Sequence, residues 1–243
     1  MAVTFTYYHL SLPLDCGTNL GRIVGGSEVT PYSVPWQVAL HLHENGGGFP
    51  TCGGTLIGPR HVLTAAHCVN EGQIDFDVVV GEHTISDSSD GTTHKVCDIK
   101  VHPDYQKRQF FDYDFAIVRL TSPVTFGSKT NAACLPLSQF KGDALAGENG
   151  TVSGWGNQDE AQNGGVNSDV LKSAEIPLLT EKKCKKDYSK YPIYYNAFPI
   201  TKRMICAGQP EGGIDSCKGD SGGKLAHFVS SSKVLMNSCF QYQ

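Results

Sequence analysis

The chain has 243 residues, of which 40% are hydrophobic and 18% are charged, and its formal net charge at pH 7 is -4. This composition is that of a globular protein of one or two domains with a buried core, and the lack of a basic patch argues against a nucleic acid partner. No run of 18 apolar residues occurs, so the sequence predicts no transmembrane helix and no membrane association.

Short runs rich in β-branched and aromatic residues recur along the chain between turn residues. In chain order they are QVALHL, HVLTA, FDVVV, FAIVRL, GTVSGW, SAEIPLL and RMICAG. The chain also contains 27 glycines and 12 prolines, which punctuate these runs. The pattern predicts an all-β sandwich or barrel. Only EKKCKKDYSKY is predicted to be helical, with Thr180 as its N-cap.

The cysteine content indicates an oxidising compartment. Nine cysteines are widely spaced, and none belongs to a CxxC pair, so no metal site is predicted from them. Wide spacing suits disulfides, and the odd number leaves at least one free thiol or an intermolecular bridge. We therefore expect a secreted, extracellular protein, although the first residues lack the features of a signal peptide. Asn149 opens an Asn-Gly-Thr glycosylation sequon, which is equally compatible with an occupied and an unused site.

The segment GDSGG, at residues 219–223, holds a serine between glycines. A serine hydroxyl is a poor nucleophile until a base takes its proton, so Ser221 would need a histidine and an orienting carboxylate. His67 follows a predicted strand in TAAHC, and Asp114 precedes an apolar run in DYDFAIVRL. Taken singly, a histidine is more often structural or on the surface than catalytic, and the aspartate is compatible with capping a turn at the end of a strand.

Nine motifs taken together are more specific than any one of them. They are RIVGG at 22–26, PWQVAL at 35–40, CGGTLI at 52–57, TAAHC at 64–68, DYDFAIVRL at 112–120, CLP at 134–136, SGWG at 153–156, MICAG at 204–208 and DSCKGDSGG at 215–223. In this order, over about residues 16–226, they resemble the trypsin/chymotrypsin-type serine proteases.

The resemblance implies two six-stranded antiparallel β-barrels with the active site between them. Residues 1–22 would be an N-terminal propeptide, and residues 23–243 the protease domain. Barrel one would span about residues 23–133 and barrel two about residues 141–243. After GDSGG the sequence departs from the family, because Lys224 replaces a proline and the SWG and PGVY segments and the final helix are missing. The second barrel is therefore expected to be incomplete.

The resemblance also implies site roles. His67 would be the general base, Asp114 would orient it, and Ser221 would be the nucleophile that forms an acyl-enzyme. The backbone N–H groups of Gly219 and Ser221 would form the oxyanion hole. Asp215 would lie at the base of the specificity pocket, and Ser216 would line the same pocket. The Asp215 carboxylate would favour protein substrates with Arg or Lys before the cleaved bond.

The resemblance also implies that the chain is activated by proteolytic cleavage. Cleavage after Arg22 by another trypsin-like protease would free the amine of Ile23, which would pair with Asp220 and order the oxyanion loop. The chain as written would be a zymogen. We expect a monomer whose binding partners are protein substrates, this activating protease and protein inhibitors.

The implied disulfides are Cys16–Cys134, Cys52–Cys68, Cys184–Cys206 and Cys217–Cys239. Cys97 has no family partner. No cofactor is expected except calcium, which many relatives bind in the loop that begins near Glu82. Thr92 occupies the place of a second carboxylate there, and Asp87 and Asp90 are possible substitutes; a solvated acidic loop is the alternative.

Two functions are therefore considered from the sequence. The first is a secreted, trypsin-like serine endopeptidase zymogen, supported by the triad candidates and Asp215. The second is a catalytically inactive, protease-like binding protein or truncated isoform, suggested by the divergent tail.

Overall fold

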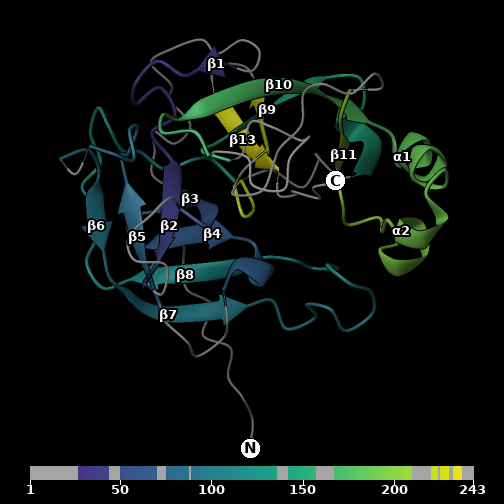
Figure 1. Cartoon of the computed structure of the whole chain (residues 1–243), viewed down its shortest axis with the longest axis horizontal. Coiled ribbons are helices and arrows are strands. Elements are labelled where there is room, and N and C mark those ends of the chain that lie inside the picture. The colour runs from purple at the N-terminus through teal and green to yellow at the C-terminus, as the bar shows by residue number, and fades with distance from the viewer. Residues whose placement is uncertain are drawn as a thin grey trace, which may run out of the picture.

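The computed structural model describes residues 27–43, 50–69, 75–87, 89–135, 142–156, 167–209, 220–223, 225–229 and 232–236. Two antiparallel sheets hold most of the regular secondary structure in this part of the chain (Figure 1). The all-β prediction is confirmed, and the arrangement is consistent with the two-barrel trypsin fold.

The first sheet has the strand order β6-β5-β2-β3-β4-β8-β7. The strands are β2 (Gln37–Leu42), β3 (Cys52–Gly58), β4 (His61–Thr64), β5 (Phe76–Val80), β6 (Thr92–His94), β7 (Val96–Val101) and β8 (Ala116–Leu120). Only Lys95 separates the edge strands β6 and β7, so they are two halves of one bent strand. The sheet thus curls back on itself as six strands, which lets both ends avoid an exposed edge.

The core of this sheet comes from the β-branched runs seen in the sequence. All seven residues of β3 are buried, and β8 alternates between buried and more exposed positions, as a strand with one solvated face should. The most completely buried side chains include Trp36, Val38, Leu40, Leu56, Val62, Val78, Val118 and Leu120. A barrel interior packed in this way gives a rigid support for residues at its rim.

The second sheet has the order β1-β10-β9-β12-β13, with β11 paired to β10. Its strands are β1 (Ser27–Glu28), β9 (Asn149–Gly154), β10 (Lys172–Leu179), β11 (Cys206–Ala207), β12 (Leu225–Val229) and β13 (Ser232–Met236). Its hydrophobic core is formed by Val152, Ala174, Ile176, Leu178 and Leu225. Among the strands that the structure describes, the order ends at β13.

One strand lies outside the barrel in which the sequence placed it. β1 falls within the range 23–133 that was assigned to barrel one, yet Ser27 pairs with Ser173 at the edge of the second sheet. The cause is the free edge of β10, whose backbone groups need partners that a short extended segment can supply. β1 therefore belongs to the second sheet.

The helix predicted after Thr180 is confirmed as α1 (Glu181–Tyr188). Thr180 Oγ1 accepts a hydrogen bond from the Lys183 backbone N–H at 3.1 Å, which is an N-cap contact. A second helix, α2 (Pro192–Ala197), was not predicted, because its sequence PIYYNA is rich in residues typical of strands. None of the helices in the described residues is long and apolar enough to span a membrane.

Candidate active site

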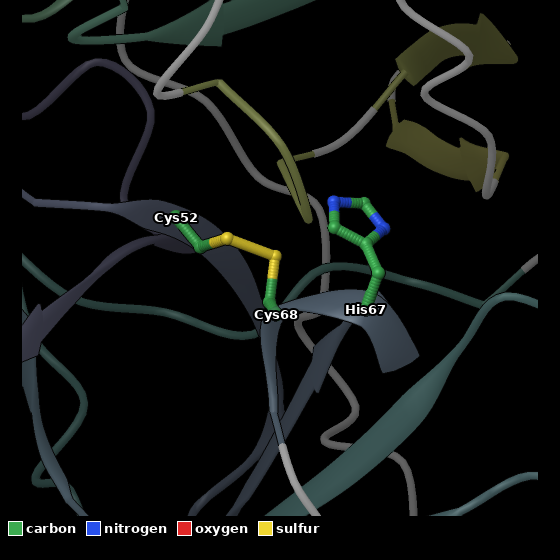
Figure 2. Close-up of side chains that lie close together, drawn as sticks. All are labelled: Cys52, His67 and Cys68. Atoms are coloured by element: carbon green, nitrogen blue, oxygen red, sulfur yellow. A yellow bond between two sulfur atoms is a disulfide. The ribbon is translucent and has the colours of Figure 1, made fainter.

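His67 lies in a single 3-10 turn, η2 (Ala66–Cys68), directly after β4. The backbone N–H of Cys68 donates to Ala65 O at 3.2 Å and closes this turn. A disulfide between Cys68 and Cys52 ties the turn to β3, as Figure 2 shows beside the imidazole ring. The histidine therefore stands on a segment with little freedom to move, and 28% of its side chain is exposed.

Asp114 reaches this histidine because of strand register. It comes two residues before β8, and Ala116, the first residue of β8, pairs with Thr64, the last residue of β4. Both of its carboxylate oxygens are used: Oδ1 accepts from the His67 backbone N–H at 2.9 Å, and Oδ2 lies 2.6 Å from His67 Nδ1.

This geometry assigns the proton on the ring. A carboxylate only accepts, so His67 Nδ1 carries the hydrogen and Nε2 is the basic nitrogen. The Asp114 side chain is only 9% exposed, which keeps water from competing for its oxygens. Burial and the nearby Asp114 charge raise the pKa of Tyr105 to about 12, so this neighbouring phenol stays neutral.

Ser221 lies on a turn that packs against the segments carrying His67. Its carbonyl accepts from the Gly53 N–H at 2.7 Å, beside the Cys52 disulfide. The next residue, Gly222, has φ of +76°, and a Cβ at that position would lie only 2.6 Å from the backbone carbonyl oxygen of Gly53. Only glycine fits both conditions. The structure thus brings the backbones around Ser221, His67 and Asp114 to one place.

Asp220, next to the serine, faces the SGWG segment. Its Oδ1 accepts from the Gly156 backbone N–H at 2.8 Å. Its carboxylate also occupies the space that a Cβ on Gly154 or Gly156 would need. The two glycines of this motif are therefore explained by the close approach of one carboxylate.

Replacing Gly156 with alanine is expected to lower the free energy of unfolding by about 1–3 kcal/mol, because the new methyl group would displace the Asp220 carboxylate. Urea denaturation would measure the change. Gly127→Ala is the matched control, since no atom lies within 4 Å of its Cβ position and its φ is unexceptional. Equal stability of the two variants would contradict the proposed contact.

Several predicted site residues lie outside the described residues. They are Arg22, Ile23, Asp215, Ser216 and Gly219, with Cys16, Cys217 and Cys239. Of the predicted disulfides, Cys52–Cys68 and Cys184–Cys206 are present. Cys134 is also disulfide-bonded. Cys97 is an exposed free thiol.

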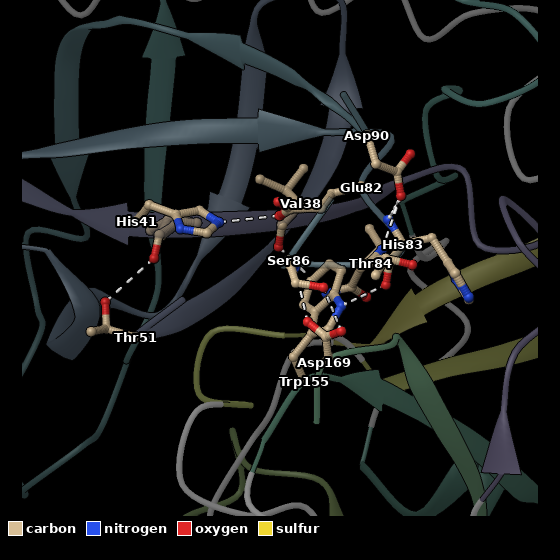
Figure 3. Close-up of polar contacts among 12 residues, drawn as sticks. Val38, His41, Thr51, Glu82, His83, Thr84, Ser86, Asp90, Trp155 and Asp169 are labelled. Carbon is tan, nitrogen blue, oxygen red and sulfur yellow. Dashed lines mark hydrogen bonds and ion pairs between the residues drawn. The ribbon is translucent and has the colours of Figure 1, made fainter. Parts of the chain in front are cut away.

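The carboxylates considered for calcium contact protein groups in the structure, and Figure 3 shows two of them, Glu82 and Asp90. Glu82 Oε2 lies 3.1 Å from His41 Nε2. Asp90 Oδ2 accepts from the backbone N–H groups of His83 and Thr84, at 2.7 and 2.9 Å. Asp87 accepts from the Ser89 hydroxyl at 2.7 Å. Calcium binding in this loop stays a prediction.

Within the described residues, one group of His, Cys and carboxylate side chains is compact enough to suggest a metal: Cys52, His67 and Cys68. Its two sulfurs form a disulfide, so neither is available as a thiolate ligand. The group is part of the support of His67 described above.

Sequence reasoning missed a second buried carboxylate beside the first. Asp112 has no exposed side-chain surface and contacts Arg203. It also missed Phe111, whose ring meets the His67 ring edge-on with centroids 5.7 Å apart. The DYD pattern at residues 112–114 could have indicated the second carboxylate. The family resemblance assigned Asp114 to the histidine and gave no role to Asp112.

Comparisons with known proteins agree with this arrangement. The sequence model of the Trypsin family matches residues 23–230. Trypsin 5G1 of Aedes aegypti is 41% identical over 210 residues, which cover 85% of this chain and 71% of the relative. The vitellin-degrading protease of Bombyx mori is 39% identical, covering 85% and 72%. The clotting factor G beta subunit of Tachypleus tridentatus is 36% identical, covering 85% and 66%.

The fold, the histidine–aspartate pair and these matches define a serine endopeptidase of the trypsin-like class, which acts on protein substrates. The chain belongs to the trypsin family.

Proposed function

We propose that this chain is the zymogen of a secreted endopeptidase that cleaves peptide bonds after Arg or Lys. The observation that carries the proposal is the double contact of Asp114 with His67, through the backbone N–H and through Nδ1. This contact leaves Nε2 as a base that faces away from the carboxylate, which is what activation of a serine requires.

The chemistry would proceed in two balanced halves. The Ser221 Oγ attacks the substrate carbonyl while its proton passes to His67 Nε2, and Asp114 stabilises the imidazolium that results. The N–H groups of Gly219 and Ser221 would bind the oxyanion. His67 then gives the proton to the leaving amine, and the acyl-enzyme forms. In the second half, water attacks the acyl-enzyme carbonyl while its proton passes to His67 Nε2. His67 then returns the proton to Ser221 Oγ, and the carboxylic acid product leaves.

Specificity would come from Asp215, with Ser216 beside it. A carboxylate at the base of an enclosed pocket is costly unless a cation pairs with it, so it selects substrates that bring one. Protein inhibitors that present an Arg or Lys to the same pocket are expected partners.

Activation would follow cleavage between Arg22 and Ile23 by a protease that itself cuts after Arg. The freed amine of Ile23 would pair with Asp220. In support, Asp220 lies beside the SGWG segment, where its Oδ1 accepts a hydrogen bond from the Gly156 backbone N–H at 2.8 Å.

Secretion is supported by the chemistry of the cysteines, since Cys52–Cys68 and Cys184–Cys206 would persist only in an oxidising compartment. Asn149, which is exposed at the start of β9, is the proposed glycosylation site.

The test is covalent labelling of Ser221 by a fluorophosphonate, before and after cleavage at Arg22–Ile23. Labelling is expected only in the cleaved chain and should be absent in the matched variant Ser221→Ala. A folded, cleaved chain that does not label would favour the alternative, a protease-like protein without catalytic activity.

A further inference from the structure

We propose that Asp112 and Arg203 form a positioning pair, which holds the loop carrying Asp114 against the second barrel and so maintains the His67–Asp114 hydrogen bond. The inference rests on the proposed function of His67 and Asp114, and it assigns a task to two residues that take no part in that chemistry.

The pair is a bidentate contact in which the carboxylate is fully buried. Arg203 Nε donates to Asp112 Oδ1 at 2.7 Å, and Nη2 donates to Oδ2 at 2.6 Å. Thr201 Oγ1 adds a third hydrogen bond to Oδ1 at 3.1 Å. The Asp112 side chain has no exposed surface, whereas that of Arg203 is 37% exposed. The hydrogen bonds from Arg203 lower the pKa of the Asp112 carboxyl, so the pair is charged at neutral pH.

The two partners belong to different barrels and are 91 residues apart in the chain. Asp112 lies in the loop between β7 and β8 of the first sheet. Arg203 lies three residues before Cys206, which begins β11 and is bridged to Cys184 in α1. The loop is thus anchored to a cross-linked part of the second barrel.

The backbone around Asp112 depends on such an anchor. Phe111 and Tyr113 both have positive φ, 57° and 55°, a conformation that bulky residues rarely adopt. Conformations of this kind persist only where the surroundings hold them. The Arg203 guanidinium also lies over the Tyr113 ring, 4.8 Å from its centroid, so one side chain restrains two consecutive residues.

Both strained residues lie next to the His67–Asp114 pair. Phe111 contacts the His67 ring edge-on, and Tyr113 immediately precedes Asp114. If the pair were lost, relaxation at these positions would move the part of the loop that directly precedes Asp114. A buried ion pair contributes little net stability compared with apolar packing, but its fixed fork geometry defines one position. Loss of a positioning pair should therefore disturb the His67–Asp114 hydrogen bond more than it lowers the free energy of unfolding.

Two variants test the pair in the full chain. Arg203→Lys keeps the charge but loses the fork. The double variant Asp112→Asn with Arg203→Gln removes both charges and leaves amides that can still hydrogen-bond, so it should fold. Lys183→Gln is the control, because it breaks an exposed ion pair of similar length, 2.8 Å to Asp187, within α1.

The first measurement is the far-downfield proton NMR signal of His67 Nδ1, identified by its loss in Asp114→Asn and followed through its exchange with water. This signal requires no reactivity of Ser221. The second is the rate of fluorophosphonate labelling after activation, with denaturant unfolding recorded in parallel. We expect both Arg203 variants to broaden or lose the signal and to slow labelling about 10- to 100-fold, and Lys183→Gln to change neither.

An unchanged signal and labelling rate in variants that merely unfold at lower denaturant would overturn the positioning role. So would a wild-type chain without the downfield signal, or a double variant that cannot fold, since the pair would then be a requirement of the fold alone. A wild type that never labels, but whose signal disappears in both Arg203 variants, would refute the proposed function and still support the pair.

Discussion

Replacing Asp114 with asparagine is expected to slow acylation of Ser221 about 10⁴-fold, the loss that the equivalent change causes in serine proteases of this type. The substitution keeps the size and shape of the side chain, and the fold should be unaffected. The expected loss comes from the tautomer of His67.

The two contacts of Asp114 explain why. Oδ1 accepts from a backbone N–H, which only an oxygen can do, so the asparagine oxygen must take this place. The NH₂ group is then forced into the place of Oδ2, 2.6 Å from His67 Nδ1. It would donate to Nδ1 and drive the ring proton to Nε2, where it would block removal of the serine proton.

Labelling kinetics of the activated chain would measure this effect. Asp104→Asn is a matched control, because it makes the same change in the same loop at a carboxylate that is 45% exposed and pairs with Lys107 at 3.7 Å. Retention of more than a tenth of the wild-type rate by Asp114→Asn would show that the tautomer argument, and with it the proposed role of Asp114, is wrong.

Replacing Asp215 with serine is expected to reduce cleavage after Arg and Lys by roughly 10²- to 10⁴-fold, with little loss toward small apolar residues at the same substrate position. A cation buried without its partner loses about 3–5 kcal/mol, which converts to that range of rate. The chemistry at Ser221 would be intact, so fluorophosphonate labelling should stay near the wild-type rate.

The measurement is kcat/KM for a matched set of peptide substrates that differ only in the residue before the cleaved bond. Asp75→Ser, an exposed aspartate, serves as the control. If Asp215→Ser kept its preference for Arg and Lys, the pocket would have to draw its selectivity from another group, and the proposed specificity would need revision.

Much of the candidate site was accessible from the sequence because its parts are marked by local patterns. A serine between glycines, a histidine in TAAHC and an aspartate before an apolar strand can each be recognised within a few residues. The same holds for α1, whose N-cap at Thr180 depends on an oxygen three residues from its donor.

Other features were decided only by the tertiary structure, because their partners are far away in the chain. The attachment of β1 to β10 depends on a free strand edge formed about 145 residues later. The His41–Glu82 contact, which engages the first carboxylate of the predicted calcium loop, depends on the pairing of β2 with β5.

Asp112 and Asp114 show the division most clearly. The sequence by itself determined that this chain has the residues of a trypsin-like protease, and its resemblance to that family already assigned Asp114 to His67. The register of β4 and β8 shows how the fold places that aspartate beside the histidine. The partner of Asp112 was decided only by the tertiary structure, which brings Arg203 to it across the two barrels, because a carboxylate's role is set by the charge and the donors that the fold brings to it.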